Sequence, residues 1–152
     1  MALPDIFDKE VSDELIERIN KLNKDTMPHW GKMNAAQMLA HCCVTYEMIY
    51  ENKHPKPGAL LRFILKNMVK KKVTNEEPYP HSIRTAPQFI INDGRDFESE
   101  KNRLTEYIEK TQKAGGEYFD NKESNSFGML NRTEWNNMLY KHLDHHLRQF
   151  GV

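Results

Sequence analysis

Residues 131–152 read NRTEWNNMLYKHLDHHLRQFGV, and this stretch decides the fold. On a helix that turns about 100° per residue, one sector roughly 100° wide collects apolar side chains together with two histidines. The side chains in that sector are Trp135, Met138, Leu139, His142, His146 and Gln149. Leucine or isoleucine is expected on a face that a folded domain buries. Two imidazoles one turn apart therefore predict that this face meets a partner or a ligand.

A third histidine lies upstream, in the stretch WGKMNAAQMLAHC, residues 30–42. Asn34, followed three residues later by Gln37, forms a capping-box signature, so we predict a helix over about Ala35–Glu51. His41 falls on the apolar face of this helix, one turn after Gln37. We therefore expect His41 to point inward, near the start of its helix.

Two further helices are predicted from apolar residues at helical spacing. The first has its N-cap at Ser12 and stops before Pro28. The second runs over about Asp96–Lys113, and Gly115-Gly116 ends it. The polar residues 117–129 show no strong hairpin signal, so we predict a loop that leads into the capping box of the last helix.

An extra helix is predicted after the turn cluster HPKPG, residues 54–58. Its apolar residues share helical spacing and are Leu60, Leu61, Ile64, Leu65 and Met68. Its basic residues lie off that face or at the C-terminal end and are Arg62, Lys66, Lys70, Lys71 and Lys72. A basic amphipathic helix can lie on a membrane. A helix that packs its apolar face in the core needs no further assumption, so we expect no membrane partner.

A long connection follows, over residues 73–94, with prolines at 78, 80 and 87. Within it, the run Phe89-Ile90-Ile91 is a candidate for extended backbone. Four main helices, one short extra helix after the second of them and this connection predict an all-α fold, a four-helix bundle. At 152 residues the chain fits a single domain, residues 1–152.

Composition excludes several classes of function. Twenty-two basic and twenty-two acidic residues balance, and no basic arm is present, so no nucleic-acid partner is expected. Cys42 and Cys43 are adjacent and are the only cysteines, which excludes a disulfide framework and suggests a reducing compartment. The start MALPDIFDKE has no features of a signal peptide, so we expect a cytoplasmic protein.

The histidines have the spacing of a metal site. His142 and His146, at i and i+4 on one helix, point the same way, and His41 can join them from a facing helix. Three protein ligands leave at least one position open, as in catalytic zinc sites. His145 falls at the border of the buried sector, where it is a rim residue or a replacement for one of the three. The remaining histidines, in turn-rich segments, are expected to be exposed: His29, His54 and His81.

Other residues on these faces have simpler interpretations. Cys42 and Cys43 offer soft thiolate ligands, but adjacent helical residues point roughly 100° apart, and Cys42 is expected to be a small core residue. The methionines of the predicted inner faces are expected to fill the core or a pocket: Met38, Met48, Met68 and Met138. Trp30 and Trp135 are expected to pack, or to line a pocket mouth.

These motifs carry a resemblance to a known superfamily. HLDHHLRQ, residues 142–149, resembles the H-x-x-H-H-R-G-Q signature of the last helix in the DinB-like superfamily of metal-binding four-helix proteins. WGKMNAAQMLAHC resembles its second-helix segment, and F-G-x-L before a Trp-bearing helix is similar to one uncharacterised branch. The resemblance spans nearly the whole chain and is weak in the middle. Leu147 and Arg148 stand where the family has arginine and glycine.

The resemblance implies metal ligands at His41, His142 and His146, the same trio that the helical geometry selects. It implies zinc or nickel as the ion, and an enzyme that uses a low-molecular-weight thiol or water to attack a small electrophile, as a transferase, isomerase or hydrolase. Gln37 and Gln149, on the same faces as the ligands, are candidates for orienting the substrate or a ligand.

The alternative is a non-catalytic metal-binding bundle, with a structural or binding role and in a homodimer. A fourth protein ligand that closes the metal site would favour this alternative, whereas an open position would favour the enzyme.

Overall fold

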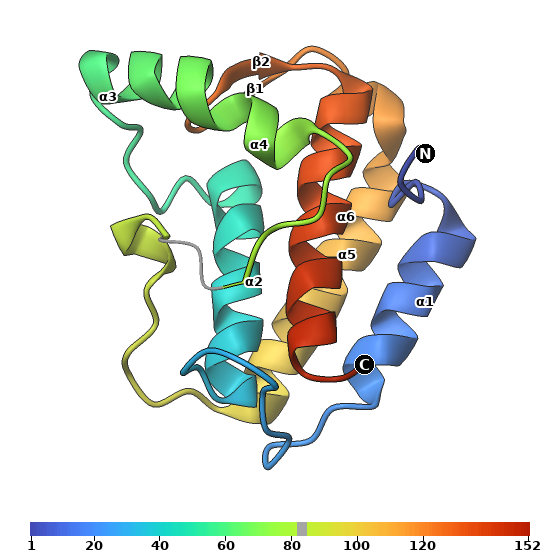
Figure 1. The fold of residues 1–152 in the computed structure, drawn as a ribbon. Helices are drawn as coiled ribbons and strands as arrows, with labels where there is room; N and C mark the ends of the chain where they lie inside the picture. The colour runs from blue at the N-terminus through green and yellow to red at the C-terminus, as the bar shows by residue number, and fades with distance from the viewer. Residues whose placement is uncertain (82–84) are drawn as a thin grey trace.

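Four helices of twelve residues or more surround a shared core, and Figure 1 shows them lying along one another. They are α1 (Lys9–Asn20), α2 (Ala35–Tyr50), α5 (Phe97–Phe119) and α6 (Arg132–Gln149). In this computed structural model, residues 1–81 and 85–152 are described. Ile19, Leu39, Ile108 and Leu139, one from each helix, are fully buried in one cluster. The all-α class is therefore confirmed.

Capping boxes fix where the two histidine-bearing helices begin. Asn34 Oδ1 accepts a hydrogen bond from Gln37 N at 2.8 Å, and Gln37 Oε1 accepts one from Asn34 N at 3.0 Å. Asn131 and Glu134 make the same reciprocal pair at the start of α6. Both boxes were predicted from the sequence, and each sets the rotation of its helix and hence the direction of its histidines. α2 ends at Tyr50, one residue earlier than predicted.

The predicted start of the first helix was wrong. α1 begins at Lys9, after an N-cap at Asp8, and Ser12 lies inside the helix. The preceding residues Ile6 and Phe7 are buried, so the chain enters the core before the helix starts. The Ser12 hydroxyl donates a hydrogen bond to Lys9 O at 3.0 Å, which satisfies it within its own turn.

The region after α5 also differs from the prediction. Gly115 leaves helical geometry with φ +75°, as its glycine suggested, but one more turn follows and ends at the buried Phe119. The predicted loop then contains a hairpin of β1 (Lys122–Ser124) and β2 (Gly128–Leu130). Ser124 Oγ closes the turn, because it accepts from Phe127 N and donates to Gly128 O, both at 2.9 Å. Such side-chain turn chemistry leaves no alternating pattern in the sequence.

The extra helix lies where it was predicted, but its apolar face does not enter the core. It consists of α3 (Ala59–Ile64), a π-helical turn (Leu65–Val69) and α4 (Lys70–Thr74). Figure 1 shows these segments as one continuous rod that crosses the molecule above α2 toward α6. Five of its large apolar side chains are exposed: Leu60, Leu61, Phe63, Ile64 and Met68. The prediction of a helix packed by its apolar face was therefore wrong, and for Met68 so was the prediction of a filling role.

The rod is attached to α6 through its C-terminal end. Lys141 Nζ donates hydrogen bonds to Lys72 O at 2.8 Å, Asn75 O at 2.8 Å and Asn75 Oδ1 at 2.7 Å. Asn137 Nδ2 donates to Thr74 O at 2.9 Å. These donors satisfy carbonyls at the end of α4, and an ammonium is favoured there by the helix dipole. Burial lowers the pKa of Lys141 to about 8, so the side chain is still protonated at pH 7.

The long connection after α4 carries one short element in its described part, a 3₁₀ turn over Pro87–Phe89. Ile90 has extended backbone angles, but Ile90 and Ile91 belong to neither described strand. Residues 82–84 of the predicted connection lie outside the described residues. Among the described residues, no helix is both long and apolar enough to cross a membrane.

Replacing Lys141 with methionine should destabilise the protein, because the apolar stem stays buried while three acceptors lose their charged donor. We expect a loss of roughly 2 kcal/mol in the free energy of unfolding, measured by urea denaturation. Lys113→Met, at an exposed position of α5, is the control and should change stability by less than about 0.5 kcal/mol. Equal stability of both variants would contradict the anchoring role of Lys141.

Candidate metal centre

Three histidines from two helices converge on one point. His41 of α2 and His142 and His146 of α6 each offer a ligand atom, and these atoms lie within 4.8 Å of one another. The Nε2 atoms of His41 and His142 are 3.1 Å apart. The His41 and His146 rings pack edge to face, with centroids 4.5 Å apart. The trio that the sequence selected is thus brought together by the fold.

Hydrogen bonds at Nδ1 fix how two of the rings present their other nitrogen. His41 Nδ1 lies 2.8 Å from Phe89 O, and a carbonyl can only accept, so Nδ1 carries the hydrogen. His146 Nδ1 lies 2.8 Å from Gln149 Oε1. Neutral His41 and His146 therefore have a bare lone pair at Nε2, as metal-binding histidines do.

The third ring, His142, completes the set. Its Nδ1 lies 3.3 Å from the hydroxyl of Thr45, which can donate or accept. When the His142 hydrogen is on Nε2, it can satisfy His41 Nε2 alone, and His146 Nε2 stays unpaired. When the hydrogen is on Nδ1, three lone pairs face a common centre. A cation satisfies all three at once, so the donor set fits a divalent metal.

Burial keeps the three imidazoles neutral. It lowers the pKa of His41, partly opposed by the hydrogen bond to Phe89 O. Burial, followed by the neighbouring His146 and His41, holds the pKa of His142 well below its usual range. Burial and then His41 lower the pKa of His146 to about 3. Metal ions bind the neutral form of imidazole, so near pH 7 few protons have to leave before a metal can bind.

Gln149 connects the centre to the loop before α2. Its Nε2 donates to Trp30 O at 2.6 Å, which leaves Oε1 for His146, and its backbone O accepts from His29 N at 2.7 Å. Gly31 has φ +85°, and a Cβ there would lie 2.5 Å from Gln149 Nε2. Only glycine allows the loop to approach this closely. Gln149 thus orients a histidine and positions the loop.

Gln37, the other candidate, has different contacts. Its Oε1 accepts from Asn34 N in the capping box, and its Nε2 donates to Asp93 O at 3.2 Å. Its amide therefore caps α2 and holds the end of the long connection.

His145 lies at the rim, as the helical geometry indicated. Its half-buried ring is 5.0 Å from that of His146, and it contacts the edges of Trp30 and Tyr79. His81, which the sequence placed in an exposed turn, is exposed but stacks on Trp30 with centroids 3.8 Å apart. Aromatic and imidazole rings from three segments therefore form one wall beside the metal centre.

The remaining candidates lie apart from the centre. His29 is exposed as expected, but the expectation was wrong for His54, whose side chain is 20% exposed because it packs against Glu47, with Nε2 2.7 Å from the carboxylate. Cys42 and Cys43 are buried, and burial raises the pKa of both thiols, that of Cys43 to about 12. The cysteines are therefore protonated core residues.

The centre lies in the wall of a cleft of about 1350 Å³. Its lining is mostly apolar and comes from α2, the rod, the long connection and α6, with the hairpin at one side. Met48, Leu65, Phe89 and Met138 are among the apolar residues. A cleft of this size takes a small organic molecule. Trp30 and Trp135 both contribute to its lining.

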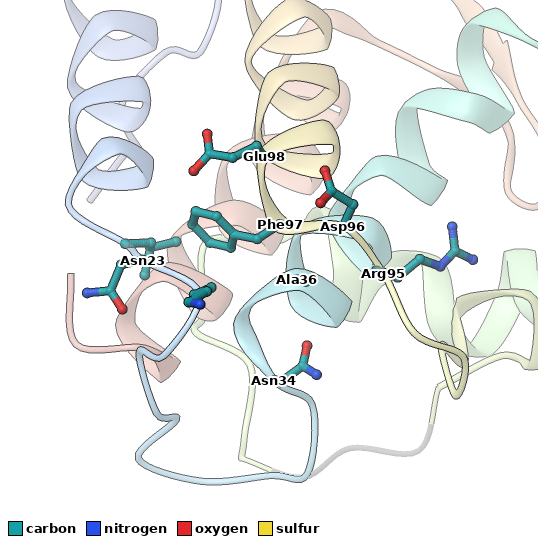
Figure 2. Close-up of a pocket in the computed structure, with 9 residues that line it drawn as sticks. Asn23, Asn34, Ala36, Arg95, Asp96, Phe97 and Glu98 are labelled. Atoms are coloured by element: carbon teal, nitrogen blue, oxygen red, sulfur yellow. The ribbon is translucent and has the colours of Figure 1, made fainter.

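A second, smaller cavity of about 440 Å³ lies where α1 ends and α2 and α5 begin. Figure 2 shows Asn34 and Asp96, the N-caps of α2 and α5, around it. Asp96 accepts from Ser99 N, and Arg95 pairs with Asp93 and Glu100. These polar groups are occupied by the helix start itself, so the cavity offers no comparable chemistry.

Comparison with known families matches residues 7–151 to the family described as "Protein of unknown function (DUF1569)". The chain belongs to the DUF1569 family. The matched residues include His41, His142, His146 and both capping boxes. No curated protein and no solved structure matches this DUF1569 chain.

The lowered pKa values make the stability of the metal-free protein depend on pH. The unfolded chain takes up protons at histidines near pH 6.5, whereas folded His146 does so near pH 3. Stability is thus fully present above about pH 6.5 and falls as the pH drops toward 3. For His146 alone we expect a loss on the order of 2 kcal/mol at pH 5, measured by urea denaturation with a chelator present.

The variant His146→Gln isolates this effect. Its free energy of unfolding should depend less on pH than that of wild type between pH 6.5 and about 4. His29→Gln, at an exposed position, should leave this pH dependence unchanged. If wild type and His146→Gln lose stability in parallel, the burial of a neutral imidazole at position 146 is not the cause.

Proposed function

We propose that this DUF1569 protein is a divalent-metal-dependent enzyme whose ion, zinc or nickel, is held by His41, His142 and His146. The observation that carries the proposal is the pair of Nδ1 bonds to Phe89 O and Gln149 Oε1, which turn bare Nε2 atoms of two buried rings to a shared centre. A divalent ion at such a centre lowers the pKa of a water or thiol and polarises a substrate oxygen.

The finer fold assignment belongs to the same proposal. We infer a four-helix bundle of the DinB-like type, formed by α1, α2, α5 and α6. It is supported by the place of the histidines, one on the second long helix and two on the last. It is also supported by the sequence resemblance, which selects the same trio.

An open coordination position favours an enzyme over a structural metal site. Within the described residues, the group of potential ligands around this centre holds the three histidines and no carboxylate or thiol. The cleft borders all three rings, so an ion held by them would be accessible to a substrate that enters the cleft.

The chain's own residues would bind and orient the reactants. Cys42 and Cys43 are protonated and are not part of the cleft lining, so a reacting thiol has to come from a small molecule, or water takes its place. The apolar walls, among them Met48, Leu65 and Met138, would exclude water and contact the carbon skeleton of a small electrophile. Gln149 and Phe89 O would keep the two rings in the ligand tautomer throughout.

Metal content tests the proposal directly. Protein purified without a His-tag and dialysed against zinc or nickel should hold about one equivalent of ion, with a raised melting temperature. His142→Ala should lose the ion. His145→Ala, three residues further along the helix at the rim of the centre, should keep it. Absence of stoichiometric metal in wild type, with no change of melting temperature on adding either ion, would refute the proposal.

The open position has its own readout. Cobalt(II) in place of zinc should give a sulfur-to-metal charge-transfer band when a small thiol such as 2-mercaptoethanol is added. A cobalt spectrum that does not respond to the thiol would indicate a closed, structural site and so the non-catalytic alternative.

Gln149→Leu should weaken zinc binding roughly 10- to 100-fold, because His146 loses the acceptor that fixes its tautomer. Gln149→Glu keeps an acceptor for His146 but loses the donor to Trp30 O, so it should bind zinc more tightly than Gln149→Leu while lowering stability relative to wild type. Gln37→Leu is the matched control: it should cost about 1 kcal/mol of stability through the lost cap and leave zinc affinity unchanged. Competition with a coloured chelator measures the zinc affinity of all three variants. Equal zinc affinities of Gln149→Leu and wild type would contradict the role of Gln149.

A further inference from the structure

The rod formed by α3, the π-helical turn and α4 presents an apolar face to solvent. Leu60, Phe63 and Met68 are 76%, 66% and 69% exposed, and Ile64 is 41% exposed. Ile64 lies four residues after Leu60 and Met68 four residues after Ile64, while Phe63 lies three residues after Leu60, so the four share one side of the helix. Single exposed apolar residues are ordinary on protein surfaces, but a continuous row on one helix indicates a binding surface.

Two residues on the opposite, basic side of the rod pair with the rest of the protein. Arg62 forms an ion pair with Glu123 of the hairpin, and Lys70 pairs with Glu134 of α6 at 2.9 Å. A third side, with Leu61 and Leu65, lines the cleft. An ordinary surface helix turns its charged side to water. Here Arg62 and Lys70 of the charged side pair with the protein, and the apolar side is turned outward.

Charge identifies the kind of surface that the rod fits. Between residues 52 and 75 the sequence has seven lysine or arginine residues and no aspartate or glutamate. Three of these lysines are exposed and form no ion pair within the described residues: Lys66, Lys71 and Lys72. A second copy of the chain would bring no carboxylate on the same segment to meet them. Anionic lipid headgroups supply negative charge beside an apolar layer, so they complement both features.

We propose that the rod docks on the surface of an anionic lipid bilayer. Leu60, Phe63 and Met68 enter the boundary between headgroups and acyl chains, while Lys71 and Lys72 contact the headgroups. We expected no membrane partner from the sequence because a helix with its apolar face in the core needs none. In the structure this face is exposed, so that reason no longer applies. Docking uses none of the metal ligands, so it stands or falls separately from the proposed enzyme activity.

Sedimentation with lipid vesicles tests the docking. Wild type should pellet with vesicles of phosphatidylcholine and phosphatidylserine and remain in solution with phosphatidylcholine alone, and added salt should weaken the binding. Lys71→Glu with Lys72→Glu should weaken binding by at least on the order of fivefold per lysine. Leu60→Ser with Phe63→Ser should weaken it by roughly tenfold or more.

Matched controls separate the rod from general charge and general hydrophobicity. Lys21→Glu with Lys24→Glu carries the same charge change at exposed positions after α1, and Met27→Ser removes an exposed apolar residue elsewhere. Both controls should bind as wild type does. No pelleting with anionic vesicles at low salt would overturn the proposal, as would equal losses in the control and rod variants. If wild type is a dimer that does not bind vesicles, and the double variant Leu60→Ser with Phe63→Ser is a monomer, the proposal is overturned. The apolar face would then bind a second copy of the chain.

Discussion

α6 is a polar helix that the fold buries on nearly every side. Most of the structure depends on the hydrogen bonds that satisfy its buried polar side chains. Its buried polar residues are Asn136, Asn137, Lys141, His146 and Gln149. Each costs free energy unless it has a hydrogen-bond partner. Asn136 binds the N-terminal segment at Ile6 N, and Gln149 binds Trp30 O. The partners of α6 are thus backbone groups of distant segments, and satisfying the helix fixes where those segments lie.

The histidines are the exception to this satisfaction. Protein groups pair with all three Nδ1 atoms, but the hydrogens available at the centre cannot satisfy all three Nε2 atoms together. A core residue such as Asn137 has its amide hydrogen-bonded within the protein. Three neighbouring ring nitrogens that face one centre at the wall of a cleft, and that protein hydrogens cannot all satisfy, are the feature by which this cluster differs from a polar core.

The sequence predicted the centre better than its surroundings. His41, His142 and His146 could be found because capping boxes and helical spacing are local, and they fix the direction of side chains on a helix. The carbonyl of Phe89 that holds His41 has no signature, since every residue carries a carbonyl. The position of the rod could not be predicted either. Helical spacing gives an apolar face but does not say whether the core has room for it, and in the structure this face lies outward while Arg62 and Lys70 pair with the hairpin and α6.

At the proposed metal centre, the charge of the ligand set would limit what can occupy the open position. Three neutral imidazoles leave the charge of a divalent ion uncompensated, and the group of potential ligands in the described residues adds no carboxylate. The low-dielectric lining of the cleft strengthens the attraction of that charge for an anion. A divalent ion held by these residues would therefore favour a thiolate or hydroxide over the neutral thiol or water, and more strongly than an ion that also has a carboxylate ligand. The same lining disfavours a free, fully hydrated anion. In the proposed enzyme, the ligand set and the apolar cleft together would favour a small molecule that carries one ionisable group on an otherwise apolar skeleton.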